Sequence, residues 1–256
     1  MTRIAPLSAP PWVVVLVVVA GLAVGLVLAR RLATTGYRLD DEDLRPVGDL
    51  PHPRGAKRRP VLGPLPHEPR PLPGAPWVIT AVVPVLWGLL AWQLGGLARG
   101  AMLPAYLLLS GVGVALVWID ADVHRLPEGL TLPALPAIAL LLAAASLTTG
   151  DWGALGRAAI CGVAGYLFYL ALALLVPGGL GLGDATLGAL VSLPLGYLGW
   201  SEAVMGIVLT YLFGGAFSLV AIALRRVRLK GYIAFGPFIV IGSLAAVFIG
   251  YPTPGP

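Results

Sequence analysis

Eight apolar stretches, each close to the length of a membrane-spanning helix, take up most of this chain. A helix needs roughly 20 apolar residues to cross the hydrocarbon core of a bilayer. The expected spans cover residues 12–29, 76–94, 102–119, 130–147, 158–176, 185–198, 203–224 and 232–249. Lipid offers the backbone no hydrogen-bond partners, and the strict alternation of a membrane β-barrel is absent from the sequence. The predicted fold class is therefore an all-α polytopic membrane protein.

Composition agrees with this prediction, because 58% of the residues are hydrophobic and only 11% are charged. Soluble domains carry about a quarter charged residues. The sixth stretch is short and follows a glycine-rich loop, so we expect a tilted or partly re-entrant segment there. The first stretch follows Arg3 and ends in Arg30 and Arg31 without a small-residue cleavage pattern. It is typical of a retained membrane anchor rather than a signal peptide.

The chain divides into three predicted parts: an anchor at residues 1–29, a charged proline-rich loop at residues 30–75 and a membrane-embedded domain at residues 76–256. The loop has an acidic run at residues 40–43 and a basic run at residues 57–59, with few large apolar residues. Such a composition cannot bury a core, so we interpret the loop as an extended linker. A substrate-docking role is the alternative.

The basic residues predict the orientation of the spans. Nine of the 17 Lys and Arg residues lie in residues 30–75, four lie in residues 225–230, and Arg125 follows the third span. With eight spans these fourteen residues share one side, and only Arg3, Arg99 and Arg157 lie on the other. Lys and Arg accumulate in cytoplasmic loops, so the crowded side is predicted to be cytoplasmic. The net charge of +5 reflects this bias. Attraction to anionic membrane lipids is expected, and nucleic-acid binding is not.

Two aspartates lie where apolar spans meet polar loops. Asp120 ends the third span and Asp184 opens the sixth, so the topology places both at the cytoplasmic boundary. An ionisable residue at the edge of the hydrocarbon layer is costly and usually functional. Asp122 is the rival of Asp120, but two positions along a helix are about 200° apart, so both cannot face one point unless the helix ends between them. Asp120 is preferred because it lies nearer the membrane. An interfacial carboxylate paired with a nearby Arg is the non-catalytic alternative for Asp120.

If the two carboxylates meet, they fit the scheme of an aspartic hydrolase. Like charges a few ångström apart cannot both ionise, so the pair shares one proton. The ionised member takes a proton from water as the water attacks a carbonyl, and the protonated member polarises that carbonyl and later protonates the leaving amine. Because hydrolysis by this scheme requires only water and the two carboxyl groups, no cofactor is expected.

The residues that other kinds of catalytic site require are not found together in this sequence. The single cysteine, Cys161, lies in the middle of a span and is interpreted as a small packing residue. The three histidines, His52, His67 and His124, are dispersed without metal-ligand spacing, and no Gly-x-Ser-x-Gly nucleophile elbow is present. We therefore predict no metal site.

At these residues the chain resembles the type IV prepilin peptidase family of membrane aspartic proteases. Asp120 is followed by Leu126-Pro127, and the Gly-x-Gly-Asp motif is Gly181-Leu182-Gly183-Asp184. Residues 233–238, in the last span, resemble a third family stretch, and the likeness covers about residues 76–250. The resemblance implies that Asp120 and Asp184 are the catalytic pair and that Gly181, Gly183 and Pro127 shape or bind at the site.

The same resemblance implies an endopeptidase of the cytoplasmic (inner) membrane that removes the short basic leader of type IV prepilins or pseudopilins. The chain departs from the family in two places. The first cytoplasmic loop lacks the two Cys-x-x-Cys pairs that accompany N-methylation in many bacterial members, so the resemblance does not support methyl transfer. Thr186 stands where the family often has a lysine, two residues after the second aspartate.

Two other functions are compatible with the aspartates. A non-catalytic pilus-assembly scaffold or a small transporter would use them as ion or proton sites, although a transporter places its charged residues near the membrane midplane. A related protease that cuts within the bilayer would need aspartates deeper in the membrane. The positions of both aspartates at span ends favour cleavage at the cytoplasmic boundary.

Overall fold

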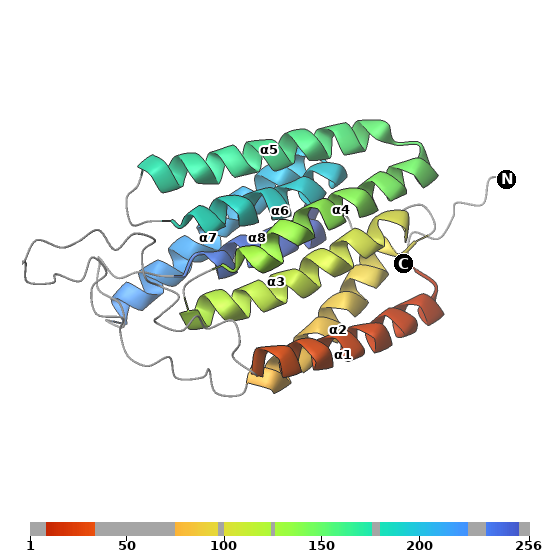
Figure 1. The fold of residues 1–256 in the computed structure, drawn as a ribbon, viewed down its shortest axis with the longest axis horizontal. Coiled ribbons are helices and arrows are strands. Elements are labelled where there is room, and N and C mark those ends of the chain that lie inside the picture. The colour runs from red at the N-terminus through yellow and green to blue at the C-terminus, as the bar shows by residue number, and fades with distance from the viewer. Residues whose placement is uncertain are drawn as a thin grey trace, which may run out of the picture.

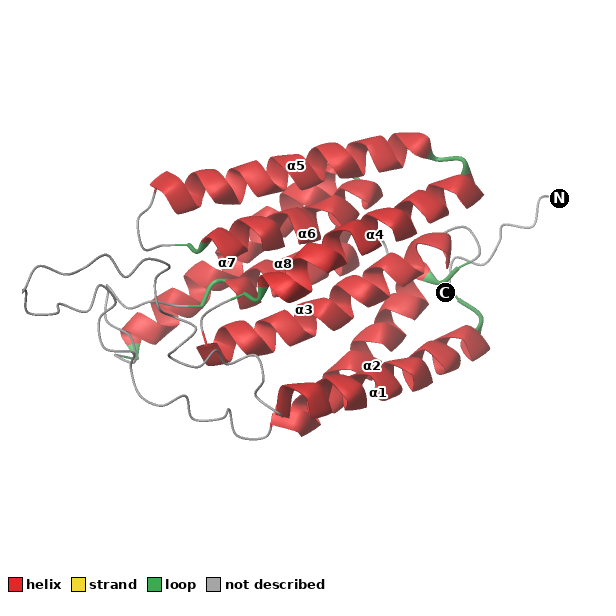
Figure 2. Ribbon diagram, in the orientation of Figure 1, coloured by secondary structure: helices red, strands yellow, loops and turns green. Residues whose placement is uncertain are grey.

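The computed structural model describes residues 9–33, 75–96, 100–123, 126–175, 180–224 and 234–250. Throughout these residues the regular structure is helical, and no strand occurs in them (Figures 1 and 2). The helices are α1 (Pro11–Ala33), α2 (Ala75–Leu94), α3 (Leu103–Val123), α4 (Glu128–Thr149), α5 (Trp152–Leu175), α6 (Leu182–Leu198), α7 (Trp200–Ala223) and α8 (Gly236–Gly250). A short 3-10 turn, Gly100–Met102, precedes α3.

Each expected span coincides with one of these helices. Six of the described helices, α1 to α5 and α7, are long and apolar enough to cross a membrane by length and composition. The remaining two, α6 and α8, are shorter apolar helices, as the brevity of the sixth stretch predicted for α6. The polytopic membrane fold is therefore confirmed. Residues 34–74, which contain nearly all of the predicted linker, lie outside the described residues, so its interpretation stays a prediction.

Successive helices run in opposite directions (Figure 1). The carboxyl ends of α1, α3, α5 and α7 therefore lie at the same end of the bundle as the amino ends of α2, α4, α6 and α8. We call this the basic end, because the connections made there hold most of the Lys and Arg residues of the sequence. By the distribution of positive charge, the basic end is expected to face the cytoplasm.

Small residues allow α5 and α6 to pack closely. A Cβ atom on Gly165 of α5 would lie 2.6 Å from the Cβ of Ser192 in α6 and 2.9 Å from the carbonyl oxygen of Gly188. Farther along the same contact, Gly196 of α6 meets Cys161, which is buried. Close backbone approach through small residues is the usual way in which membrane helices associate. Cys161 therefore lies in a packing interface, as its sequence context predicted.

At the end of the bundle opposite the basic end, Arg157 satisfies the last carbonyls of α6. Its Nε donates to the Gly196 oxygen at 2.7 Å, and one terminal nitrogen donates to the Tyr197 oxygen at 2.8 Å. The last four carbonyls of a helix have no partner within the helix, and a cation there also interacts favourably with the helix dipole. Arg157, one of the few basic residues expected on the outer side, thus stabilises the end of a short helix.

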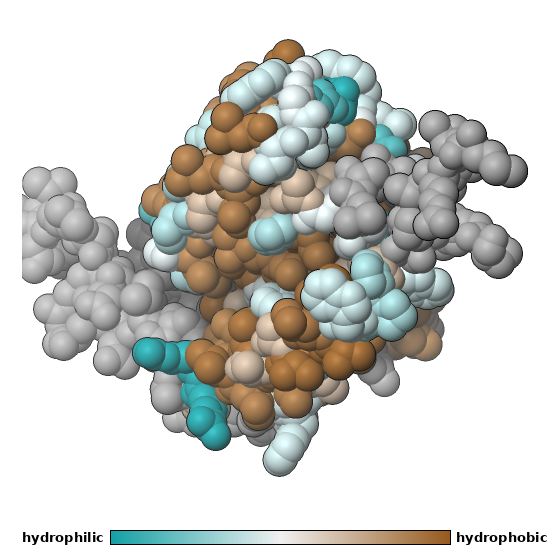
Figure 3. Space-filling view, turned by 90° about the vertical axis from the view of Figure 1, so that its right-hand side faces the viewer, coloured by the Kyte–Doolittle hydropathy of each residue, from teal (hydrophilic) through white to brown (hydrophobic). Residues whose placement is uncertain are grey.

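Large apolar side chains cover much of the described exterior. Trp77, Leu140 and Leu219 are each exposed over more than two thirds of their surface. The face in Figure 3 is mainly hydrophobic, with a few hydrophilic groups at its margins. Contiguous apolar surface of this extent is unfavourable in water and is expected where lipid surrounds a protein.

We predict that Gly165→Ala lowers the free energy of unfolding of the purified protein in detergent by about 1–3 kcal/mol, the cost of overpacking a filled interface, and so lowers its melting temperature. Gly156→Ala in the same helix is the matched control, because a Cβ there meets nothing within 4 Å. That variant should be neutral or slightly more stable, since alanine favours helix more than glycine does. Equal melting temperatures for the two variants would contradict the close approach of α5 and α6.

Candidate active site

Asp120 is buried near the carboxyl end of α3, with 5% of its surface exposed. The helix continues to Val123, beyond the end expected at residue 119. Asp122 therefore lies on the same helix, about 200° around its axis from Asp120, and it is half-buried. Of the two carboxylates, the structure turns Asp120 into the bundle.

The amino end of α8 holds the carboxylate of Asp120. The backbone N–H of Gly236 donates to Asp120 Oδ2 at 3.0 Å, across 116 positions of sequence. A Cβ atom at residue 236 would lie only 2.6 Å from the same oxygen, so only glycine allows this approach without a shift. The free N–H groups at a helix start carry partial positive charge, which favours a carboxylate there.

Asp184 lies in the first turn of α6 and is held in a comparable way. Gly181 is the N-cap of α6, and its backbone N–H donates to Asp184 Oδ2 at 2.8 Å. The N–H of Asp184 donates in return to the Gly181 oxygen at 3.0 Å. Only 7% of the Asp184 surface is exposed. The expected start of this span at residue 185 was thus a few residues late, and Asp184 belongs to the helix.

The structure brings the two aspartates together at the basic end. Helices α3, α6 and α8 contact one another, and the two carboxylates lie within electrostatic range of each other. The loop after α3 touches the start of α6, because a Cβ on Gly183 would lie 3.0 Å from the Cβ of Leu126. The two motifs that the sequence separates by about sixty residues therefore form one site.

The three other predicted site residues have different surroundings. Gly183 is needed for the close contact with Leu126, whereas a Cβ on Gly181 would meet nothing nearer than 3.7 Å. Pro127 is the N-cap of α4, and its oxygen accepts the N–H of Leu130 at 3.0 Å. Gly181 thus contributes its N–H and Gly183 its lack of a side chain, while Pro127 begins the helix that follows.

Sequence reasoning did not single out Gly236 or the aromatic residues beside Asp184. Gly236 lies within the stretch of residues 233–238 noted above, but its part in the site is a backbone N–H, which no side-chain pattern reports. Tyr169 of α5 packs its ring on Gly188, one turn from Asp184, and is 1% exposed. Tyr169 and Tyr211 both lie within electrostatic range of Asp184.

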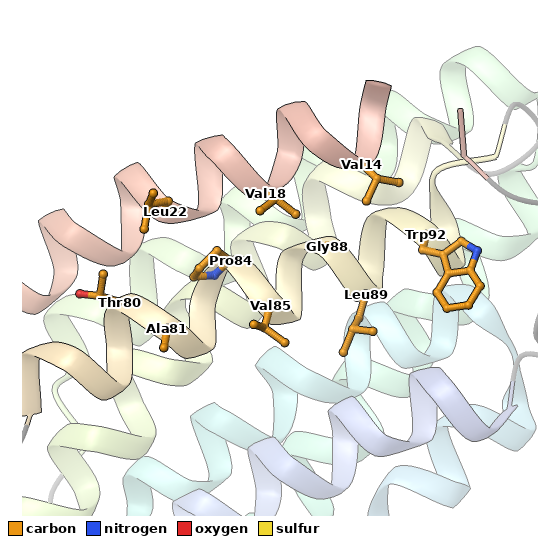
Figure 4. Close-up of a pocket in the computed structure, with 10 residues that line it drawn as sticks. All are labelled: Val14, Val18, Leu22, Thr80, Ala81, Pro84, Val85, Gly88, Leu89 and Trp92. Carbon is orange, nitrogen blue, oxygen red and sulfur yellow. The ribbon is translucent and has the colours of Figure 1, made fainter. Parts of the chain in front are cut away.

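In the part of the chain that the structure describes, no three His, Cys, Asp or Glu side chains gather closely enough to hold a metal ion. A pocket of about 670 Å³ lies elsewhere, between α1 and α2. The ten side chains and backbone positions that line it include no charged residue (Figure 4). The pocket therefore offers no titratable side chain, in contrast to the site of the two aspartates.

Part of the chain is similar in sequence to a known protein family. Residues 107–219 match the family model described as the type IV leader peptidase family. Over this segment, which is less than half of its length, the chain is similar to the type IV leader peptidase family. Both aspartates lie within this segment, whereas Gly236 lies 17 residues beyond its end at residue 219.

Curated relatives cover a similar region. The chain is 35% identical over 161 residues to a prepilin leader peptidase/N-methyltransferase of Burkholderia pseudomallei (strain K96243), covering 60% of this chain and 48% of the relative. It is 37% identical over 155 residues to the protein of that name from Aeromonas salmonicida, covering 57% and 49%. For the Aeromonas hydrophila protein the identity is 36% over 163 residues, covering 60% and 52%. The chain spans about half the length of these relatives, and no solved structure matches it.

We expect the Gly236–Asp120 contact to produce coupled effects on stability. Gly236→Ala should destabilise the protein by about 1–3 kcal/mol, because its Cβ overlaps the carboxylate. In an Asp120→Ala background the carboxylate that the new Cβ would overlap is absent, so Gly236→Ala should lower the free energy of unfolding less. The difference between the two backgrounds, the coupling energy, should be about 1 kcal/mol or more. A double-mutant cycle by thermal unfolding in detergent measures this term. Gly215→Ala, where a Cβ meets nothing within 4 Å, is the control, and strictly additive effects would contradict the contact.

The two glycines of the Gly-x-Gly-Asp motif should differ in how well they tolerate substitution by alanine. Gly181→Ala retains the backbone N–H and meets no atom nearer than 3.7 Å, so we expect a change within about 0.5 kcal/mol. Gly183→Ala must push Leu126 away and should cost about 1 kcal/mol or more. Unfolding midpoints of the two purified variants test this difference, and a more damaging Gly181→Ala would refute the described geometry.

Proposed function

We propose that the protein is an aspartic endopeptidase of the cytoplasmic membrane that removes the basic leader of type IV prepilins or pseudopilins. The observation that carries the proposal is the burial of two carboxylates at the basic end, Asp120 on α3 and Asp184 on α6, on helices that contact each other. The family match of residues 107–219 and the names of the curated relatives support this activity.

In the proposed reaction the two carboxylates share one proton. The ionised carboxylate removes a proton from a water molecule as its oxygen bonds to the carbonyl carbon of the scissile peptide. The protonated carboxyl donates a hydrogen bond to the carbonyl oxygen, and the resulting tetrahedral species collapses with breakage of the C–N bond. A proton from the pair passes to the departing amine, so the site returns to its initial state and no cofactor is consumed.

Each carboxylate is held at Oδ2 by a backbone N–H, from Gly236 for Asp120 and from Gly181 for Asp184. Backbone donors at helix starts keep the orientation of both groups through the reaction, because they belong to packed helices rather than to mobile side chains. The hydrogen-bond donors therefore need to move little when charge shifts from one aspartate to the other.

The depth of the site suits a substrate with a basic leader and an apolar helix. The leader would remain beside the cytoplasmic surface, the apolar helix would lie in the bilayer, and the bond between them would reach the basic end. A transporter would place its ionisable residues near the middle of its helices. Asp120 and Asp184 instead lie in a last and a first helical turn.

The proposal covers proteolysis and not methyl transfer. The curated relatives are named for both activities. The cysteine pairs that accompany methylation in many members are absent from this sequence, which contains a single cysteine at residue 161.

We predict that Asp120→Asn and Asp184→Asn each reduce cleavage of a co-expressed prepilin by at least about a hundredfold, because asparagine retains the size but cannot cycle a proton. Loss of the leader is read as a mobility shift on a gel, with membrane accumulation of each variant measured in parallel. Asp122→Asn is the matched control and should cleave at nearly the wild-type rate, since Asp122 turns away from Asp120. Normal cleavage by either of the first two variants would remove that residue from the mechanism.

A further inference from the structure

Aromatic rings from three helices form a continuous row beside the aspartates. The Phe168 ring of α5 lies 5.3 Å from that of Tyr169 and 6.2 Å from that of Tyr211 in α7. The Tyr211 ring lies 5.4 Å from Phe235, and Phe235 lies 6.1 Å from Phe238 of α8. We call these five residues the ring row. Centroid separations of 4.5–7 Å are those of interacting aromatic pairs.

The ring row passes both carboxylates. At one end, Tyr169 packs on Gly188 in α6, and both tyrosines lie within electrostatic range of Asp184. Near the other end, Phe235 directly precedes Gly236, whose N–H donates to Asp120. The ring row therefore includes a residue packed on α6, one turn from Asp184, and the residue directly before the backbone donor to Asp120.

The middle of the row is open to the surroundings. Phe168 is 39% exposed and Tyr211 is 37% exposed, whereas Tyr169 beneath them is buried. Helix α5 packs chiefly against α6, and α7 packs chiefly against α8, so the rings of Phe168 and Tyr211 meet between two separate helix pairs. More than a third of the surface of each of these two residues is left exposed.

We propose that the ring row is the docking surface for the apolar helix of the membrane polypeptide that the enzyme cuts, at the segment directly after the scissile bond. The inference rests on the proposed function for the identity of the occupant. A cut at the basic end leaves the apolar segment inside the bilayer, beside the rings that flank the aspartates. Rigid aromatic side chains offer a large apolar contact at a small cost in conformational entropy, which suits recognition of apolar side chains.

Site-specific photocrosslinking tests the surface without requiring turnover. A photoreactive phenylalanine analogue replaces Phe168 or Tyr211 in the Asp184→Asn protein, co-expressed with an epitope-tagged prepilin. Tyr166 is the matched control, because it lies on α5 with 40% exposure but two positions from Phe168, on another side of the helix. We expect crosslinking to the prepilin to be at least fivefold stronger from positions 168 and 211 than from 166. Equal or stronger crosslinking from position 166, or crosslinks to lipid alone, would overturn the inference.

Kinetics provide a second readout. Phe168→Ala should raise KM for the prepilin about two- to tenfold, the loss expected for one aromatic contact, with kcat changed less than twofold. Tyr166→Ala should leave both parameters near wild type. A Phe168→Ala variant with unchanged KM would count against docking on the ring row. If this variant fails to accumulate, the crosslinking result still decides, because the photoreactive residue retains a ring at the position.

The two proposals can fail separately. Crosslinks from positions 168 and 211 together with no cleavage by the wild-type protein would support the docking surface and remove the peptidase function. Normal cleavage by the wild-type protein without crosslinks from either position would preserve the peptidase function and overturn the docking surface.

Discussion

Two carboxylates buried at the edge of a membrane need hydrogen-bond donors, and this constraint determines how the helix ends are arranged at the basic end of the bundle. Asp120 and Asp184 are each satisfied at Oδ2 by a backbone N–H at the start of a helix. For Asp184 the donor is local, since Gly181 caps the same helix. For Asp120 the donor comes from α8, so α3 and α8 must pack with their ends in register. An unsatisfied buried carboxylate would be far more costly than the loss of one helix contact.

The short helices follow from the same arrangement. At 1.5 Å per residue, the 15 residues of α8 span about 22 Å and the 17 residues of α6 about 26 Å, less than the roughly 30 Å hydrocarbon core. Short helices allow amino ends to lie beside the last turn of the longer α3, where Asp120 is. At the other end of α6, Arg157 binds the carbonyls that the helix leaves unpaired. Helix length, end capping and the position of the carboxylates therefore depend on one another.

Sequence reasoning located the helices well because apolar runs of membrane length are a strong signal, and it preferred Asp120 to Asp122 because Asp120 is nearer the membrane. Burial of Asp120 agrees with that preference, although the catalytic role of both aspartates stays a prediction. The sequence could not reveal that Gly236 donates to Asp120, because a backbone N–H leaves no side-chain pattern and its partner lies 116 positions away. The ring row also escaped prediction, since its members come from α5, α7, α8 and the residue just before α8, and only packing makes them neighbours.

The central claim is that the segment after Asp120 and the segment before Asp184 meet in one site. Disulfide trapping tests it most directly, with Leu126→Cys and Gly183→Cys introduced together into a Cys161→Ser protein. The Cβ separation of 3.0 Å places this pair close to the 3.5–4.5 Å typical of disulfides, so mild oxidation of membranes should link it almost completely. A Leu126→Cys, Gly215→Cys pair in the same background should stay reduced, since a Cβ at residue 215 meets no atom within 4 Å. Failure of the first pair to link, in a protein that is folded and inserted, would show that the two motifs do not meet.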